Sequence, residues 1–186
     1  MPITKLEGRD DSPLVLAIDP ALSTTGYAVL SVLTKEIIYI DKYCTSTKLD
    51  YDKRVDLIVT ELFNIAVKYG VSAIALEDGF VGTNLRTACQ LAELRGSIGG
   101  VFSFNKYPVC KLQPSYVRKA IGCSGNASKM DVAMMLTSIY SNNPKFKRIG
   151  PYSDKQNKDK TSDMYDALGI GVAYCTFCLK GAGIDG

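Results

Sequence analysis

The chain has 186 residues, of which 46% are hydrophobic and 22% are charged. This length and balance predict one globular domain over 1–186, with a core large enough to fold without disulfide or metal staples. The sequence contains no histidine, which excludes Ser-His-Asp and Cys-His catalysis, histidine metal sites and histidine acid–base chemistry. Hydrolytic chemistry must therefore rest on carboxylates, lysines, tyrosines or thiols.

The start of the chain and its cysteines indicate a cytoplasmic protein. The N-terminal segment lacks the apolar core of a secretory signal, and no apolar run approaches the roughly 18 residues needed to span a bilayer. In a reducing compartment we expect the cysteines to be small buried hydrophobes. The Cys175-x-x-Cys178 pair is not expected to bind zinc, because no second pair or histidine completes four ligands. The cysteines are Cys44, Cys89, Cys110, Cys123, Cys175 and Cys178.

The net charge of +3 is unevenly distributed along the chain. Residues 94–160 carry 12 lysines and arginines against 3 acidic residues, whereas the rest of the chain carries 10 against 16. An acidic cluster beside a basic flank suits a metal-dependent enzyme that acts on a polyanion. The alternative is that these lysines and arginines are merely solvated surface.

The N-terminal third predicts a polar lead-in followed by three strands. Residues 14–18 are a continuous apolar run, typical of a strand buried on both faces, and Pro20 ends its ladder. Residues 23–26 have the composition of a turn. The expected segments are the lead-in 1–13, the first strand 14–18, and two further antiparallel strands at 27–33 and 36–40.

The remainder alternates helices and strands. Apolar residues recur at three- and four-residue steps over 51–69, which predicts an amphipathic helix ended by Gly70. Residues 141–162 are polar and basic, and we expect a long loop there before the last helix. The other expected elements are strands at 71–76 and 108–112 and helices at 84–104, 114–121, 127–141 and 163–179. Together they predict an α/β fold with one mixed sheet covered by helices on both faces.

Four carboxylates fall at special points of these elements. Asp19 follows the first strand and Glu77 the fourth, so parallel neighbouring strands would bring both to one sheet edge. Asp163 and Asp166 are three residues apart on the last helix and share a face. Four converging carboxylates repel one another, and two divalent cations with a preference for oxygen ligands relieve that repulsion. Taken singly, each residue has an alternative role as a turn residue, loop charge or helix cap.

At these residues the sequence resembles the RuvC family of Holliday junction resolvases, within the RNase H-like superfamily. Four segments carry the resemblance in the family's order: 16–29 (LAIDPALSTTGYAV), 75–80 (ALEDGF), 127–132 (ASKMDV) and 162–170 (SDMYDALGI). Ala21 stands where the family usually has glycine, and the lead-in and the 141–162 connection are longer. These departures suggest a divergent, phage-type member that acts in a bacterial or phage-infected cell.

The resemblance implies a fold, a reaction and a cofactor. The fold would be an RNase H-like sheet of five strands, three antiparallel and then parallel, flanked by helices. The activity would be Mg²⁺-dependent endonucleolytic cleavage of four-way DNA junctions by paired symmetric nicks, leaving 5′-phosphate and 3′-hydroxyl ends. Two Mg²⁺ ions, with Mn²⁺ as a substitute, would be bound by Asp19, Glu77, Asp163 and Asp166.

The resemblance also implies partners. Phe80 would stack on unpaired bases at the junction centre, the alternative being a core ring. Lys129 would contact the DNA backbone with the neighbouring Arg118 and Lys119, the alternative being a solvated helix end. The family acts as a homodimer, without a nucleotide cofactor or a membrane. Three glycines of the 84–104 helix would permit either the close approach of a partner helix or tight packing of this helix on its own sheet. These are Gly96, Gly99 and Gly100.

Three other functions compete with this interpretation. A sugar-kinase or actin-like nucleotide binder would need a second domain, for which 186 residues leave no room. A catalytically silent DNA-binding module would not need all four carboxylates. A nuclease of the same fold that cuts forks, flaps or three-way junctions remains the alternative.

Overall fold

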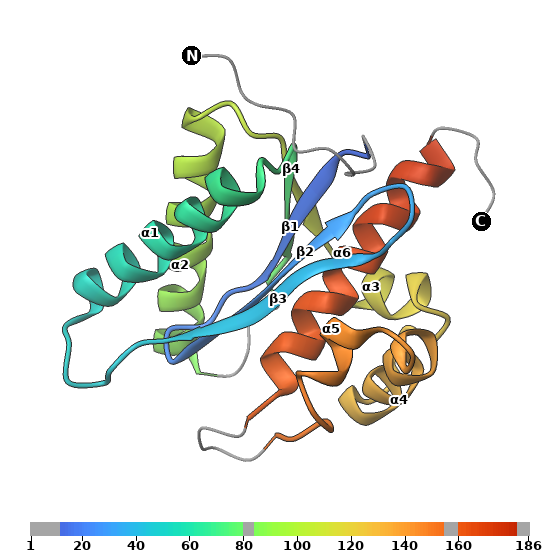
Figure 1. Cartoon of the computed structure of the whole chain (residues 1–186). Coiled ribbons are helices and arrows are strands. Elements are labelled where there is room, and N and C mark those ends of the chain that lie inside the picture. The colour runs from blue at the N-terminus through green and yellow to red at the C-terminus, as the bar shows by residue number, and fades with distance from the viewer. Residues whose placement is uncertain (1–11, 80–83, 155–159, 182–186) are drawn as a thin grey trace.

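The structure is a computed structural model that describes residues 12–79, 84–154 and 160–181. It contains a five-stranded mixed sheet in the order β3-β2-β1-β4-β5 (Figure 1). The first three strands are antiparallel neighbours, and the last two run parallel to β1, as the sequence predicts. The strands are β1 (Leu14–Asp19), β2 (Thr24–Ser31), β3 (Ile37–Cys44), β4 (Ala73–Glu77) and β5 (Val109–Leu112).

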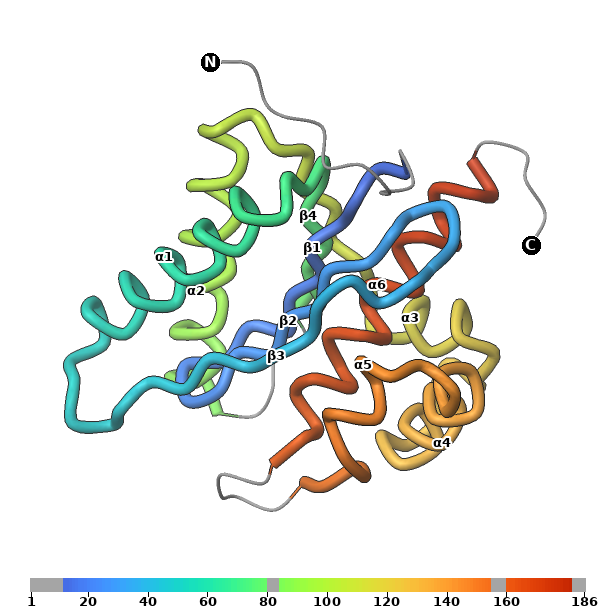
Figure 2. Tube along the Cα trace, viewed as in Figure 1, coloured from blue at the N-terminus to red at the C-terminus, as the bar shows by residue number. Residues whose placement is uncertain are grey.

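Helices cover both faces of this sheet (Figures 1 and 2). The helices α1 (Tyr51–Tyr69) and α2 (Leu85–Phe104) pack on one face. On the other face α6 lies directly against β1 and β2. The helices on this side of the sheet are α3 (Pro114–Ala120), α4 (Lys129–Tyr140), α5 (Pro144–Lys147) and α6 (Ser162–Gly181).

The central strand β1 shows why its sequence is apolar throughout. Val15 and Ala17 belong to the core beneath α6, whereas Leu16 and Ile18 belong to the core beneath α1 and α2. All four are fully buried. A strand covered on both faces has no solvent side, so its sequence does not alternate between apolar and polar residues.

The helix α1 begins and ends where its sequence predicts. The Asp50 side chain accepts a hydrogen bond of 2.8 Å from the backbone N–H of Lys53, which caps the first turn. Gly70 ends the helix with φ of +63°, a left-handed conformation that glycine adopts without a Cβ penalty.

Two predictions for the β1–β2–β3 region are wrong in detail. The strand β2 already begins at Thr24, so 24–26 are strand rather than turn. The Thr25 hydroxyl instead donates to the Ala21 carbonyl oxygen at 2.7 Å and stabilises the tight connection before it. The strand β3 continues past residue 40 to Cys44, because Thr24 at the start of β2 pairs with it.

The described parts of the lead-in and of the 141–162 connection contribute buried residues, which their polar composition does not predict. Ser12 is buried and its side-chain oxygen accepts a hydrogen bond of 2.8 Å from the Ser31 hydroxyl, while 1–11 lie outside the described residues. The connection contains α5, from which Phe146 enters the core together with Ile149. Residues 155–159 lie outside the described residues.

None of the helices within the described ranges combines the length and apolar character needed to cross a bilayer.

Candidate active site

The sheet topology brings the four predicted carboxylates to one edge. Asp19 is the last residue of β1 and Glu77 the last of β4. These strands are parallel, with Ile18 opposite Leu76, so the two acidic residues leave the sheet side by side. The helix α6 carries Asp163 in its first turn and Asp166 one turn further on, and it lies against β1 and β2 at the same end of the molecule (Figure 2).

The pKa of Asp19 reflects the charges of the other three carboxylates. Burial, as the largest cause, raises the pKa of the Asp19 carboxyl well above its ordinary value. The charges of Asp166 and Glu77 raise this pKa further, and Asp163 adds to them. The Lys129 ammonium opposes the shift. The sequence prediction that these carboxylates share one site is consistent with this mutual repulsion.

Two of the other carboxyls are perturbed in the same direction. Burial and then the charge of Asp166 raise the pKa of Glu77, and Lys129, Arg95 and Arg118 counteract that rise. Burial also raises the pKa of Asp166, although its ion pair with Lys129 opposes the change. Partly buried carboxyls that raise one another's pKa, with cations at their margin, are typical of sites that bind metal or anionic substrate.

Two lysines pair with the carboxylates of α6. The Lys129 ammonium donates to Asp166 Oδ2, and the Lys160 ammonium donates to Asp163 Oδ1 at 2.9 Å. Asp163 is 4% exposed, and its Oδ2 is buried without a hydrogen-bond partner among the described residues. Within the same ranges no three acidic or thiol side chains are placed so that they could hold one metal ion together. The carboxylates therefore affect one another's charge, although the described side chains are not arranged as the ligands of one metal ion.

The donor set fits a hard divalent cation. All four candidate ligands are carboxylates, and Mg²⁺ and Mn²⁺ prefer oxygen ligands. The unpartnered Asp163 Oδ2 is a buried acceptor that a cation would satisfy. A divalent cation would also offset the repulsion that raises the pKa of Asp19.

A cavity of about 240 Å³ opens beside these residues. Its walls include Arg118, whose Nη1 donates to the Gly125 carbonyl oxygen at 3.0 Å and is thereby oriented. Lys119, the next residue, is exposed, and the end of its side chain lies against Gly125 instead of in the cavity wall. The lining residues are Glu77, Pro114, Val117, Arg118, Lys129, Val132, Asp166 and Gly169.

The predicted DNA-contacting residues are thus divided. Lys129 and Arg118 lie at the carboxylate site, whereas Lys119 does not line it. Phe80 lies outside the described residues, so its stacking role stays a prediction.

Sequence reasoning missed how closely Gly26 approaches α6. A Cβ at Gly26 would lie 1.9 Å from the backbone oxygen of Asp163 and 3.0 Å from the backbone nitrogen of Met164. Gly26 is also paired with Asp19 across the β1–β2 ladder. This glycine therefore stands between two of the candidate ligands. Its place in the 16–29 segment was the only sequence signal, and that segment does not reveal a contact with α6.

Arg95 of α2 is a second residue that sequence reasoning missed. A Cβ at Gly79 would lie 2.2 Å from its Nη1, so its guanidinium covers the chain two residues after Glu77. The Arg95 Nε is buried without a hydrogen-bond partner in the described part of the chain. This contact depends on how α2 packs, for which the local sequence holds no signal.

The glycine face of α2 is open. A Cβ at Gly96, Gly99 or Gly100 would meet none of the described residues within 4 Å. The alternative that these glycines let α2 pack tightly on its own sheet is therefore wrong. They instead line a hollow of about 480 Å³ together with Arg95, Ser103, Val109 and Lys111.

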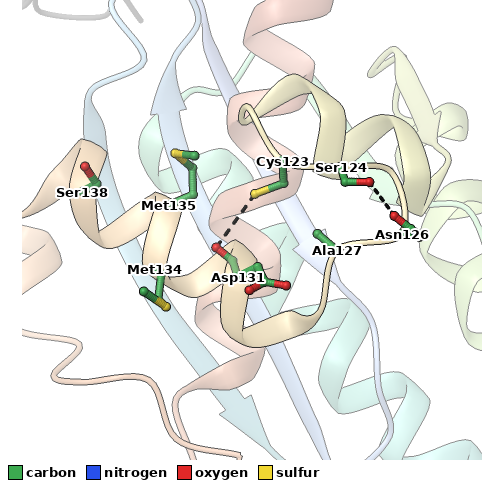
Figure 3. Close-up of a pocket in the computed structure, with 8 residues that line it drawn as sticks. All are labelled: Cys123, Ser124, Asn126, Ala127, Asp131, Met134, Met135 and Ser138. Atoms are coloured by element: carbon green, nitrogen blue, oxygen red, sulfur yellow. Dashed lines mark hydrogen bonds between the residues drawn. The ribbon is translucent and has the colours of Figure 1, made fainter.

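The larger hollow on α4 is not this site (Figure 3). It has a volume of about 630 Å³ and is lined mainly by small polar and methionine side chains. Its one carboxylate among the described lining residues, Asp131, accepts hydrogen bonds of 2.9 and 2.7 Å from the N–H and hydroxyl of Ser128. These bonds lower the pKa of Asp131 and form a capping box for α4. The lining residues labelled in Figure 3 are Cys123, Ser124, Asn126, Ala127, Asp131, Met134, Met135 and Ser138.

Comparison with known proteins finds a family model and several relatives that are similar to this chain. Residues 15–150 match the family model described as crossover junction endodeoxyribonuclease RuvC. The RuvC of Ehrlichia ruminantium is 31% identical over 165 residues, covering 86% of this chain and 94% of its own length. The RuvC of Ehrlichia chaffeensis is 32% identical over 127 residues, covering 67% of this chain and 81% of its own length.

Solved structures confirm the RNase H-like architecture. Thermus thermophilus RuvC in complex with a Holliday junction substrate superposes with a TM-score of 0.71 at 21% identity, covering 91% of this chain and 96% of that one. The yeast mitochondrial Holliday junction resolvase Ydc2 superposes with a TM-score of 0.61 at 17% identity, covering 88% and 78%. At these identities the likeness establishes the fold.

Proposed function

Because the chain belongs to the RuvC family of crossover junction endodeoxyribonucleases, we propose that it resolves four-way DNA junctions as a divalent-metal-dependent endonuclease. The observation that carries this proposal is the meeting of four carboxylates at one sheet edge, beside Lys129 and Arg118. A negatively charged centre with a cationic margin suits metal-assisted cleavage of a phosphodiester.

Asp19, Glu77, Asp163 and Asp166 would hold the cations, Mg²⁺ or Mn²⁺. Bound there, the cations supply Lewis-acid activation of water and of phosphate oxygens. The four side chains provide oxygen ligands from three elements of the fold, so their relative positions are set by the pairing of β1 with β4 and by the seat of α6. Lys129 and Arg118 would orient the phosphate by charge. The expected products carry 5′-phosphate and 3′-hydroxyl ends.

Two symmetric nicks in one junction need two such sites, and a C₂ homodimer displays them on one face. We place the dimer contact on the open glycine face of α2. Large apolar side chains are exposed at both ends of this helix, since Leu85 and Phe104 are 70% and 83% exposed. A cytoplasmic location remains part of this proposal.

The test is cleavage of labelled DNA in the presence of Mg²⁺. We expect paired nicks in a four-way junction, slower cleavage of forks, flaps and three-way junctions, and none of linear duplex. Asp163→Asn and Asp166→Asn should abolish cleavage while retaining junction binding. Each variant loses a metal ligand, whereas the basic side chains that would contact DNA remain. Asp56→Asn, an exposed acidic residue of α1, is the matched control and should cleave normally.

The outcome separates this proposal from its alternatives. Equal cleavage of all branched DNAs would identify a broader branched-DNA nuclease of the same fold. Binding without cleavage in any divalent metal would identify a catalytically silent DNA-binding module. Undiminished cleavage by both aspartate variants would refute the carboxylate site.

A further inference from the structure

The ion pair between Lys160 and Asp163 is a feature that the proposed reaction does not use. The two atoms, Lys160 Nζ and Asp163 Oδ1, are 2.9 Å apart, and the side chains are 32% and 6% exposed. Lys160 comes three residues before Asp163, outside the four sequence segments that resemble the RuvC family. An ammonium donates hydrogen bonds and accepts none. The Lys160 ammonium therefore occupies an Asp163 oxygen through which this carboxylate would bind a metal ion.

The backbone holds Lys160 in this position. Its carbonyl oxygen accepts a hydrogen bond from the Lys42 ammonium of β3. The next residue, Thr161, donates from its hydroxyl to the Pro151 carbonyl oxygen at 2.9 Å and from its N–H to the Ser153 carbonyl oxygen at 3.0 Å. The Ser153 N–H donates back to the Thr161 hydroxyl at 2.7 Å. Lys160 therefore projects from a braced chain segment directly before α6.

The opposite oxygen of Asp163 has no such partner in the described part of the chain. Asp163 Oδ2 is buried without a hydrogen bond among the described residues, and Lys160 leaves it unsatisfied. The Lys160 charge also acts on Asp166, where it opposes the rise in pKa. Lys160 thus neutralises the acidic face of α6 only in part, as a displaceable counter-ion would.

We propose that Lys160 is a counter-ion that exchanges partners: it neutralises Asp163 until a divalent cation takes that carboxylate, and its ammonium then contacts a DNA phosphate beside the site. The first half concerns metal binding alone, whereas the second rests on the proposed function. No bond is made or broken in this exchange. Displacement from Asp163 leaves the ammonium at the rim of a site that receives a polyanion, where phosphate oxygens are the available acceptors.

The test compares Lys160→Met and Lys160→Arg with the wild type. Mn²⁺ affinity is measured without DNA by electron paramagnetic resonance of the free ion. Lys160→Met keeps an unbranched side chain that is one atom shorter and removes its charge. We therefore expect Mn²⁺ to bind about 2- to 10-fold more tightly, since a partly exposed ion pair no longer competes. Lys160→Arg should bind Mn²⁺ like the wild type.

Junction binding is then measured in Ca²⁺ over a series of salt concentrations. Loss of one phosphate contact should reduce the slope of log affinity against log salt by about one for Lys160→Met, and cleavage at saturating Mg²⁺ should fall. Lys160→Arg should keep the salt slope and the cleavage of the wild type. The matched control is Lys180→Met, an exposed lysine at the other end of α6, about 25 Å along the helix axis. It should change neither Mn²⁺ affinity nor slope.

Each result decides one half of the proposal. Unchanged or weaker Mn²⁺ binding by a folded Lys160→Met or Lys160→Gln variant overturns the competition with metal. An unchanged salt slope overturns the phosphate contact. If the wild type binds Mn²⁺ and cuts junctions while the Lys160 variants behave like it, only this inference fails. If the wild type binds no Mn²⁺, the proposed function fails with it.

Discussion

At the scale of single residues, Asp19 illustrates a site that costs stability. Burial and three neighbouring carboxylates disfavour its charged form and raise its pKa. A carboxyl whose pKa is higher in the folded than in the unfolded chain stabilises the fold fully below its ordinary pKa. That contribution is lost as the pH rises through the raised value. At neutral pH, which is above the ordinary pKa of an aspartate, and without divalent metal, Asp19 therefore works against folding.

Asp19→Asn should consequently stabilise the protein while abolishing cleavage. In EDTA at neutral pH we expect a gain of about 1–3 kcal/mol, the scale of an uncompensated buried polar or charged group. This corresponds to a Tm increase of about 2–4 °C per kcal/mol. Calorimetry over a pH series should show the difference from wild type growing as the pH rises. Asp56→Asn on α1 should show no such gain, and a lower Tm for Asp19→Asn throughout would contradict the repulsion argument.

At the scale of elements, the packing of α6 against β2 decides where the Asp163 and Asp166 carboxylates lie. Two glycines permit this approach. A Cβ at Gly26 would meet the Asp163 backbone oxygen at 1.9 Å, whereas a Cβ at Gly171 would meet the side chain of Leu30 at 2.5 Å and Ala17 Cβ at 3.2 Å. The first contact is with backbone beside the site, and the second is with side chains in the core.

Gly26→Ala should therefore move the start of α6 and impair the site more than the fold. We expect Mn²⁺ affinity to fall by about tenfold or more, because a shift of well under 1 Å misplaces a ligand in an ordered site. The stability loss should be about 1–3 kcal/mol, as for other overpacked positions. Gly171→Ala is the control, with a similar stability loss and unchanged Mn²⁺ affinity. Equal loss of Mn²⁺ binding in both variants would show that α6 responds as a whole.

At the scale of the whole molecule, the open face of α2 is where a second copy would pack. Nothing in the described chain lies within 4 Å of a Cβ at Gly100. Gly100→Leu should therefore fold at least as stably as the wild type, since leucine exceeds glycine in helix propensity by about 0.5–1 kcal/mol. It should nevertheless be monomeric in sedimentation velocity and nick junctions on one strand at a time. Lys53→Leu on the exposed side of α1 should remain dimeric. A dimeric Gly100→Leu would place the interface elsewhere.

The sequence by itself determined the sheet and the identity of the acidic residues. Buried strands such as β1 are recognisable as continuous apolar runs, and the sequence of α1 contains the residues that cap and end the helix. These elements are therefore encoded in the local sequence. The lack of histidine is enough to exclude whole classes of chemistry. The order of Asp19, Glu77, Asp163 and Asp166 along the chain already predicts a shared site.

Only the tertiary structure decided which other residues meet that site. Lys160 pairs with Asp163, Arg95 covers Gly79, and Gly26 touches α6. The segment after residue 141 likewise gains α5 because Phe146 finds a core to enter. These contacts depend on distances between elements that are remote in sequence or on how a side chain is directed. Periodicity and composition report which face of an element is buried, but contain no information about the atom that it meets across the interface.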